Sequence, residues 1–292
     1  MRSFGQYNPR AVAIWLLGCA AIAMLCPNPI IILLSLGGAA ALRIARRDRE
    51  TLGSLLFYLG LAVITPLFNL IFSRSGATVL LVVNHHPVTL EALLCGLGSA
   101  VMLLAVLLWM RTFSVIMTTD RMMYLLGGLW PGLALLLSLT LRFIPLFGRQ
   151  AQRINSTQRA LGMYKDDNIV DSVKGGGRVF SILTTWALEN GIITADSMRA
   201  RGYGTGRRTA YTLYRFRMQD GVLTAAAAVL LGVCIAALLS GALDFEYYPR
   251  MQSIPASPMA IAAYGAYGLM VFIPTIIETE AKLRWHSLRS GI

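Results

Sequence analysis

The residues best suited to specific chemistry form two short motifs, in each of which arginine shortly precedes glycine. The motifs are Gln158-Arg159-Ala160-Leu161-Gly162 and Met198-Arg199-Ala200-Arg201-Gly202-Tyr203-Gly204. The carboxyl end of a helix carries partial negative charge and unpaired carbonyls, so these are ordinary residues for ending a helix. Arginine also presents several fixed donors that suit carboxylates. Two such ends on one basic segment favour docking into a pair of acidic grooves; the alternative is that each only caps its helix.

Both motifs belong to the longest polar part of the chain, residues 148–217. Residues 142–217 contain thirteen Arg and Lys against five Asp and Glu. Two amphipathic helices are predicted here from apolar residues at helical spacing. The first apolar face consists of Ile144, Phe147, Ala151, Ile154, Gln158 and Leu161, and the second of Val179, Ile182, Leu183, Trp186 and Ile193. The second helix is expected to begin after Gly175, Gly176 and Gly177, which form either a hinge between the two helices or a plain linker.

The rest of the chain is typical of an integral membrane protein. Of its 292 residues, 56% are hydrophobic and only 14% are charged, and several uncharged runs approach the length that crosses about 30 Å of hydrocarbon. The formal charge of +12 indicates basic cytoplasmic loops in a bilayer protein, and no nucleic-acid partner is expected. We predict an all-α, polytopic fold with about six transmembrane helices and a cytoplasmic insert of amphipathic coupling helices.

Six segments are expected to cross the membrane, with both termini and the polar insert in the cytoplasm. They are residues 11–26, 30–42, 52–72, 88–110, 222–243 and 259–277. The run 122–147 is apolar enough to cross as well, but a crossing there would place the basic insert outside, against the charge rule. We therefore expect a broken helix that stays on the inner side, because glycine, proline and arginine interrupt the run. The interrupting residues are Gly127, Gly128, Pro131, Arg142 and Pro145.

These segments suggest three parts of the chain. Residues 1–120 hold the N-terminal transmembrane helices, residues 121–220 the broken helix and the coupling module, and residues 221–292 a transmembrane hairpin with a basic tail. The four cysteines show no spacing that indicates a disulfide or a metal site, and neither do the adjacent His85 and His86.

Several stretches of the sequence are similar to one family. They are Pro66-Leu67-Phe68-Asn69, Ser73-Arg74-Ser75-Gly76, Thr89-Leu90-Glu91-Ala92, Leu139-Thr140-Leu141-Arg142-Phe143-Ile144-Pro145, Ala195-Asp196-Ser197-Met198-Arg199-Ala200-Arg201-Gly202-Tyr203-Gly204 and Arg208-Thr209. With these, residues 60–215 resemble the transmembrane T component (EcfT family, CbiQ-like) of energy-coupling factor (ECF) transporters, a branch of the ABC transporters. The resemblance implies that two Ala-Arg-Gly signatures insert into grooves on two cytoplasmic ATPases. A separate membrane S component would bind the substrate, a vitamin or another micronutrient.

The resemblance assigns ATPase docking to the two motifs. The residues concerned are Arg159, Ala160, Gly162, Arg199, Ala200, Arg201 and Gly202. The second signature matches in full, whereas the first has Leu161 in place of arginine, and Arg159 lies two residues earlier on another part of the helix. The two ATPase sites are therefore predicted to be unequal. This chain has no Walker motif and no predicted catalytic residue, cofactor or metal, so ATP and Mg are expected in the partner ATPases.

Three polar residues in apolar segments have a structural interpretation. Glu91 is expected to hydrogen-bond to Thr89 or Asn69, and Arg142 is expected to reach the interface or a carbonyl. Two other classes of protein stay open. A self-contained secondary transporter or channel would show inverted repeats or paired broken helices, and a membrane-embedded enzyme would gather His, Asp or Glu at one depth.

Overall fold

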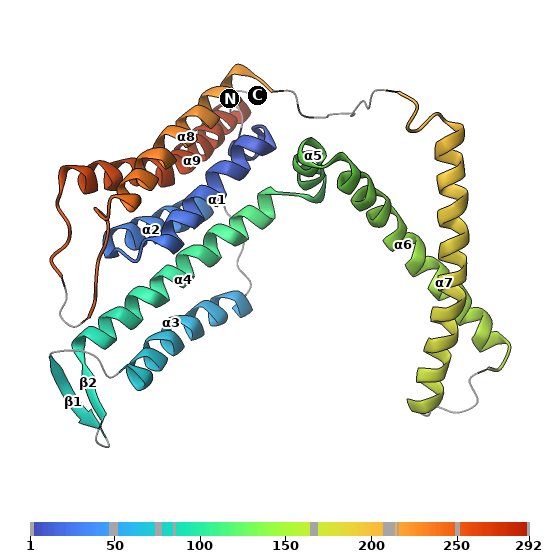
Figure 1. Ribbon diagram of the computed structural model, residues 1–292, viewed down its shortest axis with the longest axis horizontal. Coiled ribbons are helices and arrows are strands. Elements are labelled where there is room, and N and C mark those ends of the chain that lie inside the picture. The colour runs from blue at the N-terminus through green and yellow to red at the C-terminus, as the bar shows by residue number, and fades with distance from the viewer. Residues whose placement is uncertain are drawn as a thin grey trace. The chain divides into compact units, whose positions relative to one another are not determined.

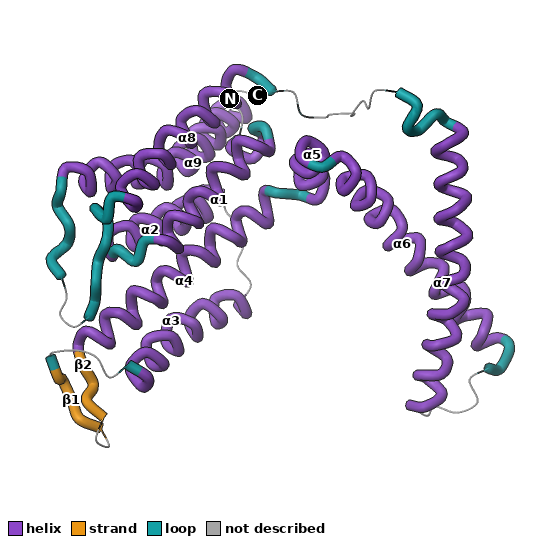
Figure 2. Tube along the Cα trace, viewed as in Figure 1, coloured by secondary structure: helices purple, strands orange, loops and turns teal. Residues whose placement is uncertain are grey.

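The computed structural model describes residues 3–46, 52–73, 78–83, 86–163, 169–206, 214, 216–248 and 252–290. The chain forms two compact units. One, here called the bundle, comprises residues 1–121 and 214–292; the other, here called the module, comprises residues 122–213. Both are built from long helices (Figure 2), so the predicted all-α class is confirmed.

In its described residues, the bundle has six long helices with short additional elements at their ends (Figure 1). In chain order these elements are η1 (Phe4–Gln6), α1 (Pro9–Leu25), α2 (Pro29–Arg46), α3 (Leu52–Phe72), β1 (Val79–Val83), β2 (His86–Thr89), α4 (Leu90–Ile116), α8 (Met218–Leu239) and α9 (Pro258–Ser290). Strands β1 and β2 pair antiparallel, and most of this hairpin lies between the expected membrane segments 52–72 and 88–110, where residues 73–87 suggest a loop with a short β-branched and leucine-rich run. Helix α1 lies in the core, since Trp15 and Leu16 are almost fully buried and α1 contacts α2, α4, α8 and α9.

The described helices long and apolar enough to cross a membrane differ in part from the expected set. They are α2, α3, α4, α8 and α9, together with α6 (Pro131–Ala160) of the module. Helix α1 is shorter, at 17 residues, although residues 11–26 were expected to cross. By length and composition, α6 is therefore a further candidate span. That residues 122–147 stay on the inner side of the membrane remains a prediction.

Glycines let pairs of bundle helices approach closely. A Cβ atom at Gly38 in α2 would overlap Cγ1 of Val271 in α9, and one at Gly96 in α4 would lie 2.8 Å from Cα of Pro66 in α3. Both distances are too short for a real side chain, so glycine is needed at these two contacts. The apolar surface buried between the helices depends on this backbone approach.

Two buried carboxylates hold the N-terminal segment against the bundle. The Asn8 N–H donates to Oδ1 of Asp220 at 2.8 Å, while the Arg217 N–H donates to Oδ2 of the same carboxylate at 2.9 Å. The Phe4 N–H donates to Oε2 of Glu278 at 3.0 Å. Asp220 and Glu278 lie in α8 and α9, so these bonds connect the start of the chain to its last two helices.

The polar residues singled out in α3 and α4 have structural partners. The Glu91 carboxylate accepts hydrogen bonds from the backbone N–H and the hydroxyl of Thr78, the latter at 2.7 Å. This partner differs from the expected Thr89 or Asn69. The Asn69 carbonyl oxygen accepts from the Tyr248 hydroxyl at 3.2 Å. Burial raises the pKa of Tyr248, so its hydroxyl keeps the proton that it donates.

Candidate docking site at two helix ends

The two predicted motifs end the two long helices of the module. Helix α5 (Thr119–Leu129) is followed after Trp130 by α6 (Pro131–Ala160), and α7 (Ile169–Ala200) completes the module. The expected break lies at Pro131, which takes the first position of α6. Proline is tolerated there because the N–H group that it lacks would have no partner within the helix. Gly127 and Gly128 are inside α5.

Four of the five expected interruptions do not break a helix. Gly127 and Gly128 lie inside α5, and Arg142 and Pro145 lie inside α6, so the prediction was wrong at these positions. Proline in a helix interior removes one hydrogen bond. Here Phe143 and Phe147, two residues before and after Pro145, stack on each other with their ring centroids 5.7 Å apart, which helps the helix to continue. The Arg142 side chain is exposed.

Helices α6 and α7 pack against each other through part of their predicted apolar faces. Phe147 meets Trp186 edge to face, with ring centroids 5.8 Å apart. The Arg178 guanidinium of α7 donates to the Met163 carbonyl, just beyond α6, at 3.0 Å. The middle of the α6 face is half-buried or buried, whereas its outer members, Ile144 and Leu161, are 59% and 71% exposed. The contact therefore covers only the middle of the first predicted face.

The end of α6 is closed by a left-handed glycine. Gly162 has φ +66°. Its N–H donates to the Arg159 carbonyl at 3.0 Å, and the Met163 N–H donates to the Gln158 carbonyl at 3.1 Å. These two bonds form the Schellman arrangement, in which glycine is favoured because a Cβ is strained at positive φ.

The end of α7 repeats this geometry. Gly202 has φ +80°, its N–H donates to the Arg199 carbonyl at 2.9 Å, and the Tyr203 N–H donates to the Met198 carbonyl at 3.0 Å. The two ends can therefore be aligned residue by residue through their hydrogen bonds. Both have arginine, then alanine, then a variable residue, then the left-handed glycine.

The alignment changes the interpretation of Arg159. It occupies the same position as Arg199, so the two ends share this arginine, although Arg159 still lies two residues before Leu161. The variable position holds Leu161 in α6 and Arg201 in α7. Sequence reasoning missed the correspondence because it aligned only the three-residue signatures; the shared Arg-Ala-x-Gly spacing could have shown it.

The end of α8 has the same glycine cap as α6 and α7 but no arginine. Gly241, after α8, has φ +69°, and the same two bonds are made by Gly241 and Ala242 to the carbonyls of Leu238 and Ala237. The last turn of α8 has no basic residue. The cap therefore does not need arginine, which weakens the alternative that the motifs are helix caps and nothing more.

The side chains at both ends are exposed. This holds for Arg159, Ala160, Leu161, Arg199, Ala200 and Arg201. Among the described residues, no carboxylate lies within ion-pair distance of Arg199 or Arg201. Two positively charged groups at the end of α7 are thus available to an acidic partner, at a place where the helix itself provides carbonyl groups and a defined backbone turn.

The three glycines do not lie between the helices. Gly175, Gly176 and Gly177 are inside α7, which begins at Ile169, so the prediction of a helix that starts after them was wrong. The connection between α6 and α7 comes earlier in the chain. Glycine lowers helix propensity by about 1 kcal/mol per residue, but this local preference is weak and tertiary context overrides it. Gly175 is buried.

Large apolar side chains of α7 stay uncovered. Phe180, Leu188 and Ile192 are 71%, 66% and 65% exposed, although α7 is not among the helices apolar enough to span a membrane. An exposed apolar face on such a helix marks contact with a partner or with the membrane surface. The described residues contain no group of three or more His, Cys, Asp or Glu that could hold a metal ion.

Comparison with known proteins gives the family. The family model of CbiQ, described as cobalt transport protein, matches residues 2–212. The chain belongs to the CbiQ family. Three proteins named energy-coupling factor transporter transmembrane protein EcfT are similar to it. The protein of Streptococcus equi subsp. equi is 28% identical over 198 residues, which are 62% of this chain and 71% of that protein.

The other two matches are shorter. The EcfT of Lacticaseibacillus paracasei is 32% identical over 105 residues, and that of Listeria innocua serovar 6a is 35% identical over 103 residues. Each covers 35% of this chain and, respectively, 40% and 39% of the relative. The resemblance stated from the sequence motifs is confirmed. With its six long apolar helices among the described residues, this CbiQ-family chain is a multi-pass membrane protein of transport.

Proposed function

We propose that this chain is the T component of an ECF-type importer. It would transmit ATP-driven motion of two cytoplasmic ATPase subunits to a membrane S component that binds a vitamin or another micronutrient. The observation that carries the proposal is the matched geometry of the ends of α6 and α7, each with arginine followed by a left-handed glycine. Two equivalent ends suit two similar ATPase subunits.

The packing of the module supports a transmitting role. A movement imposed on one helix end reaches the other helix through the Phe147–Trp186 contact and the bond from Arg178 to Met163. The S component could pack on the exposed apolar face of α7 and would then move together with this helix. In this arrangement the module and both termini lie in the cytoplasm, and ATP and Mg bind to the ATPases.

The deciding experiment reverses charge at the end of α7. Arg201→Glu and Arg199→Glu are each expected to release at least one ATPase from the detergent-solubilised complex and to abolish ATP-driven uptake, because acidic grooves would repel the new carboxylate. The matched control is Arg149→Glu, at an exposed position on α6 about 16 Å along the helix from its end. We expect this control to keep both ATPases and full uptake.

A separate measurement tests whether the two docking sites are unequal. Leu161 removes one guanidinium from the first end, so each ATPase subunit should bind the unmutated segment 142–217 with a different affinity. Equal binding of both subunits would contradict the predicted inequality. Undiminished uptake by the Arg201→Glu complex, or solute movement by the purified chain alone in vesicles, would overturn the coupling role and favour a self-contained transporter.

A further inference from the structure

The surfaces of the two helix ends differ in chemistry although their backbones match. The hydrogen bonds that align the ends place Leu161 opposite Arg201 and Met163 opposite Tyr203. Leu161 and Met163 are 71% and 47% exposed, and Arg201 and Tyr203 are exposed as well. At both positions the α6 end therefore presents an apolar side chain where the α7 end presents a charged or polar one.

The earlier positions of the two ends add no further difference at the surface. Arg159 and Arg199 are the same residue and are both exposed. Gln158 differs from Met198, its counterpart in α7, but Gln158 is buried and so is not available to a partner. The contrast between the two surfaces thus rests on the two apolar residues of the α6 end.

The apolar end of α6 has a fixed backbone. The Leu161 N–H donates to the Thr157 carbonyl at 3.0 Å, and the Met163 carbonyl accepts from the Arg178 guanidinium of α7 at 3.0 Å. A surface that is already held in one conformation loses less entropy when a partner covers it. Exposed apolar side chains on such a surface favour a partner that removes them from water.

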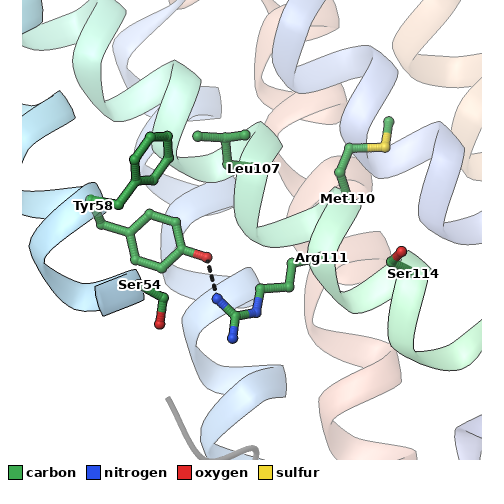
Figure 3. Close-up of a pocket in the computed structure, with 7 residues that line it drawn as sticks. Ser54, Tyr58, Leu107, Met110, Arg111 and Ser114 are labelled. Atoms are coloured by element: carbon green, nitrogen blue, oxygen red, sulfur yellow. Dashed lines mark hydrogen bonds between the residues drawn. The ribbon is translucent and has the colours of Figure 1, made fainter. Parts of the chain in front are cut away.

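The charged end of α7 differs from arginines that have partners within the chain. Figure 3 shows the Arg111 guanidinium bonded to the Tyr58 hydroxyl, at 3.2 Å, in the hollow between α3 and α4. The Arg121 guanidinium likewise donates to the Ile116 carbonyl at 2.8 Å. For Arg201, the described part of the chain offers no carboxylate within ion-pair distance. Its planar fork is therefore available to a carboxylate of a partner.

We propose that the two ATPase grooves differ in chemistry, an inference that rests on the coupling role proposed above. The groove that receives α6 is apolar where Leu161 and Met163 enter it, and the groove that receives α7 has a carboxylate that pairs with Arg201. A guanidinium is costly to bury in an apolar groove, and a leucine leaves a buried carboxylate unpaired. Each end thus suits only its own groove, and the importer contains two different ATPase chains in one fixed order.

The deciding variant is Leu161→Arg in the full-length chain, immobilised in detergent micelles. Each ATPase subunit that purifies with the chain is titrated onto it separately. An apolar groove would reject the new charge, so one subunit should bind at least about tenfold more weakly, whereas an acidic groove would bind the variant more tightly. Leu161 is exposed at a helix end where arginine is favourable, so the variant is expected to fold.

A second variant separates lost apolar contact from a steric clash. Leu161→Ala introduces neither charge nor bulk, and it should weaken the same ATPase subunit about tenfold because most of the buried apolar side chain is removed. The matched control is Leu283→Arg. Leu283 is also 71% exposed but lies in α9, outside both ends, so this variant should bind both subunits as wild type does.

Salt distinguishes the two grooves without any substitution. Between 0.1 and 1 M salt the Debye length falls from about 10 to about 3 Å. The subunit that depends on Arg201, identified by the variant Arg201→Leu, should bind about tenfold more weakly at the higher salt concentration. The subunit that depends on Leu161 should keep its affinity, because apolar burial does not depend on charge.

Three results would overturn the proposal and leave the coupling role in place. Leu161→Arg would bind one subunit more tightly, which would make the first groove acidic. Leu161→Arg would leave both affinities unchanged, which would mean that the apolar end contacts the membrane surface or no partner. A single kind of ATPase chain would purify with the protein, so that both ends meet the same groove. The coupling role itself fails by a different result, the absence of ATPase binding to the unmutated chain.

Discussion

The Trp15 indole nitrogen donates a hydrogen bond to the Met270 carbonyl at 2.7 Å, and both residues are fully buried. This carbonyl would normally accept from the N–H four residues later in α9, which is where Pro274 lies. Proline has no N–H, so α9 has an unpaired acceptor in the middle of the bundle. Helix α1 provides the missing donor and thereby fixes the contact between the first and last long helices.

Replacing Trp15 by phenylalanine should destabilise the bundle by about 1–3 kcal/mol, because the buried Met270 carbonyl loses its short bond and keeps only the weak one from the Cys19 thiol at 3.9 Å. The free energy of unfolding of the full chain in detergent micelles measures the effect. Pro274→Ala restores the helical N–H, so the cost of Trp15→Phe should be smaller by about 1 kcal/mol in that background. If Trp15→Phe lowers the free energy of unfolding equally in both backgrounds, the Trp15 indole does not replace the N–H group that Pro274 lacks. Trp285→Phe is a control at a 70% exposed side chain and should change stability by less than about 0.5 kcal/mol.

Two adjacent glycines in α2 provide a test of helix packing. A Cβ at Gly38 would overlap the Val271 side chain and lie 3.3 Å from its carbonyl oxygen, whereas one at Gly37 would meet no atom within 4 Å. Gly38→Ala should therefore destabilise the bundle by about 1–3 kcal/mol. Gly37→Ala should stabilise it by about 0.5–1 kcal/mol, since alanine is the better helix former. Thermal unfolding of the two variants in detergent compares them directly, and equal melting temperatures would mean that α2 and α9 do not pack closely at Gly38.

Much of the helical framework could be predicted because apolar composition and helix ends are local signals. The segment Leu52–Phe72 was expected as one helix and is one, and Pro131 breaks the run 122–147. The glycines at 162 and 202 end their helices as predicted, because positive φ at a helix end strongly favours glycine. These features depend on a few neighbouring residues.

Contacts between distant residues could not be predicted in the same way. Trp15 and Met270 are 255 positions apart, and no periodicity relates them. The partner of Glu91 is Thr78 because the hairpin β1–β2 turns the chain back, and the short β-branched and leucine-rich run that forms β1 does not by itself reveal its pairing with β2. In the candidate site, the equivalence of Arg159 and Arg199 differs from these contacts, because the shared Arg-Ala-x-Gly spacing is local, and the hydrogen bonds that align the two helix ends agree with it.

Two glycines of α7 lie inside a helix although glycine disfavours helix formation, and their position leads to a functional prediction. Gly176 and Gly177 are inside a continuous helix, yet a Cβ at either would meet no atom within 4 Å. Packing therefore does not require glycine at these two positions. Glycine weakens a helix locally, and these residues lie next to Arg178, whose side chain holds the end of α6 through Met163. We expect α7 to bend here when the docked ends move.

The variant Gly176→Ala with Gly177→Ala should stabilise α7 by about 0.5–1 kcal/mol per substitution and lower ATP-driven uptake by the assembled transporter, while both ATPases stay bound. Uptake into vesicles and co-purification measure the two effects separately. Gly191→Ala is the matched control, because Gly191 is in the same helix and also has no atom within 4 Å of an added Cβ. This control should stabilise the helix by the same amount per substitution without slowing uptake. If uptake by the double variant equals that of wild type, α7 acts as a rigid rod, and the motion must pass from α6 to α7 by another route.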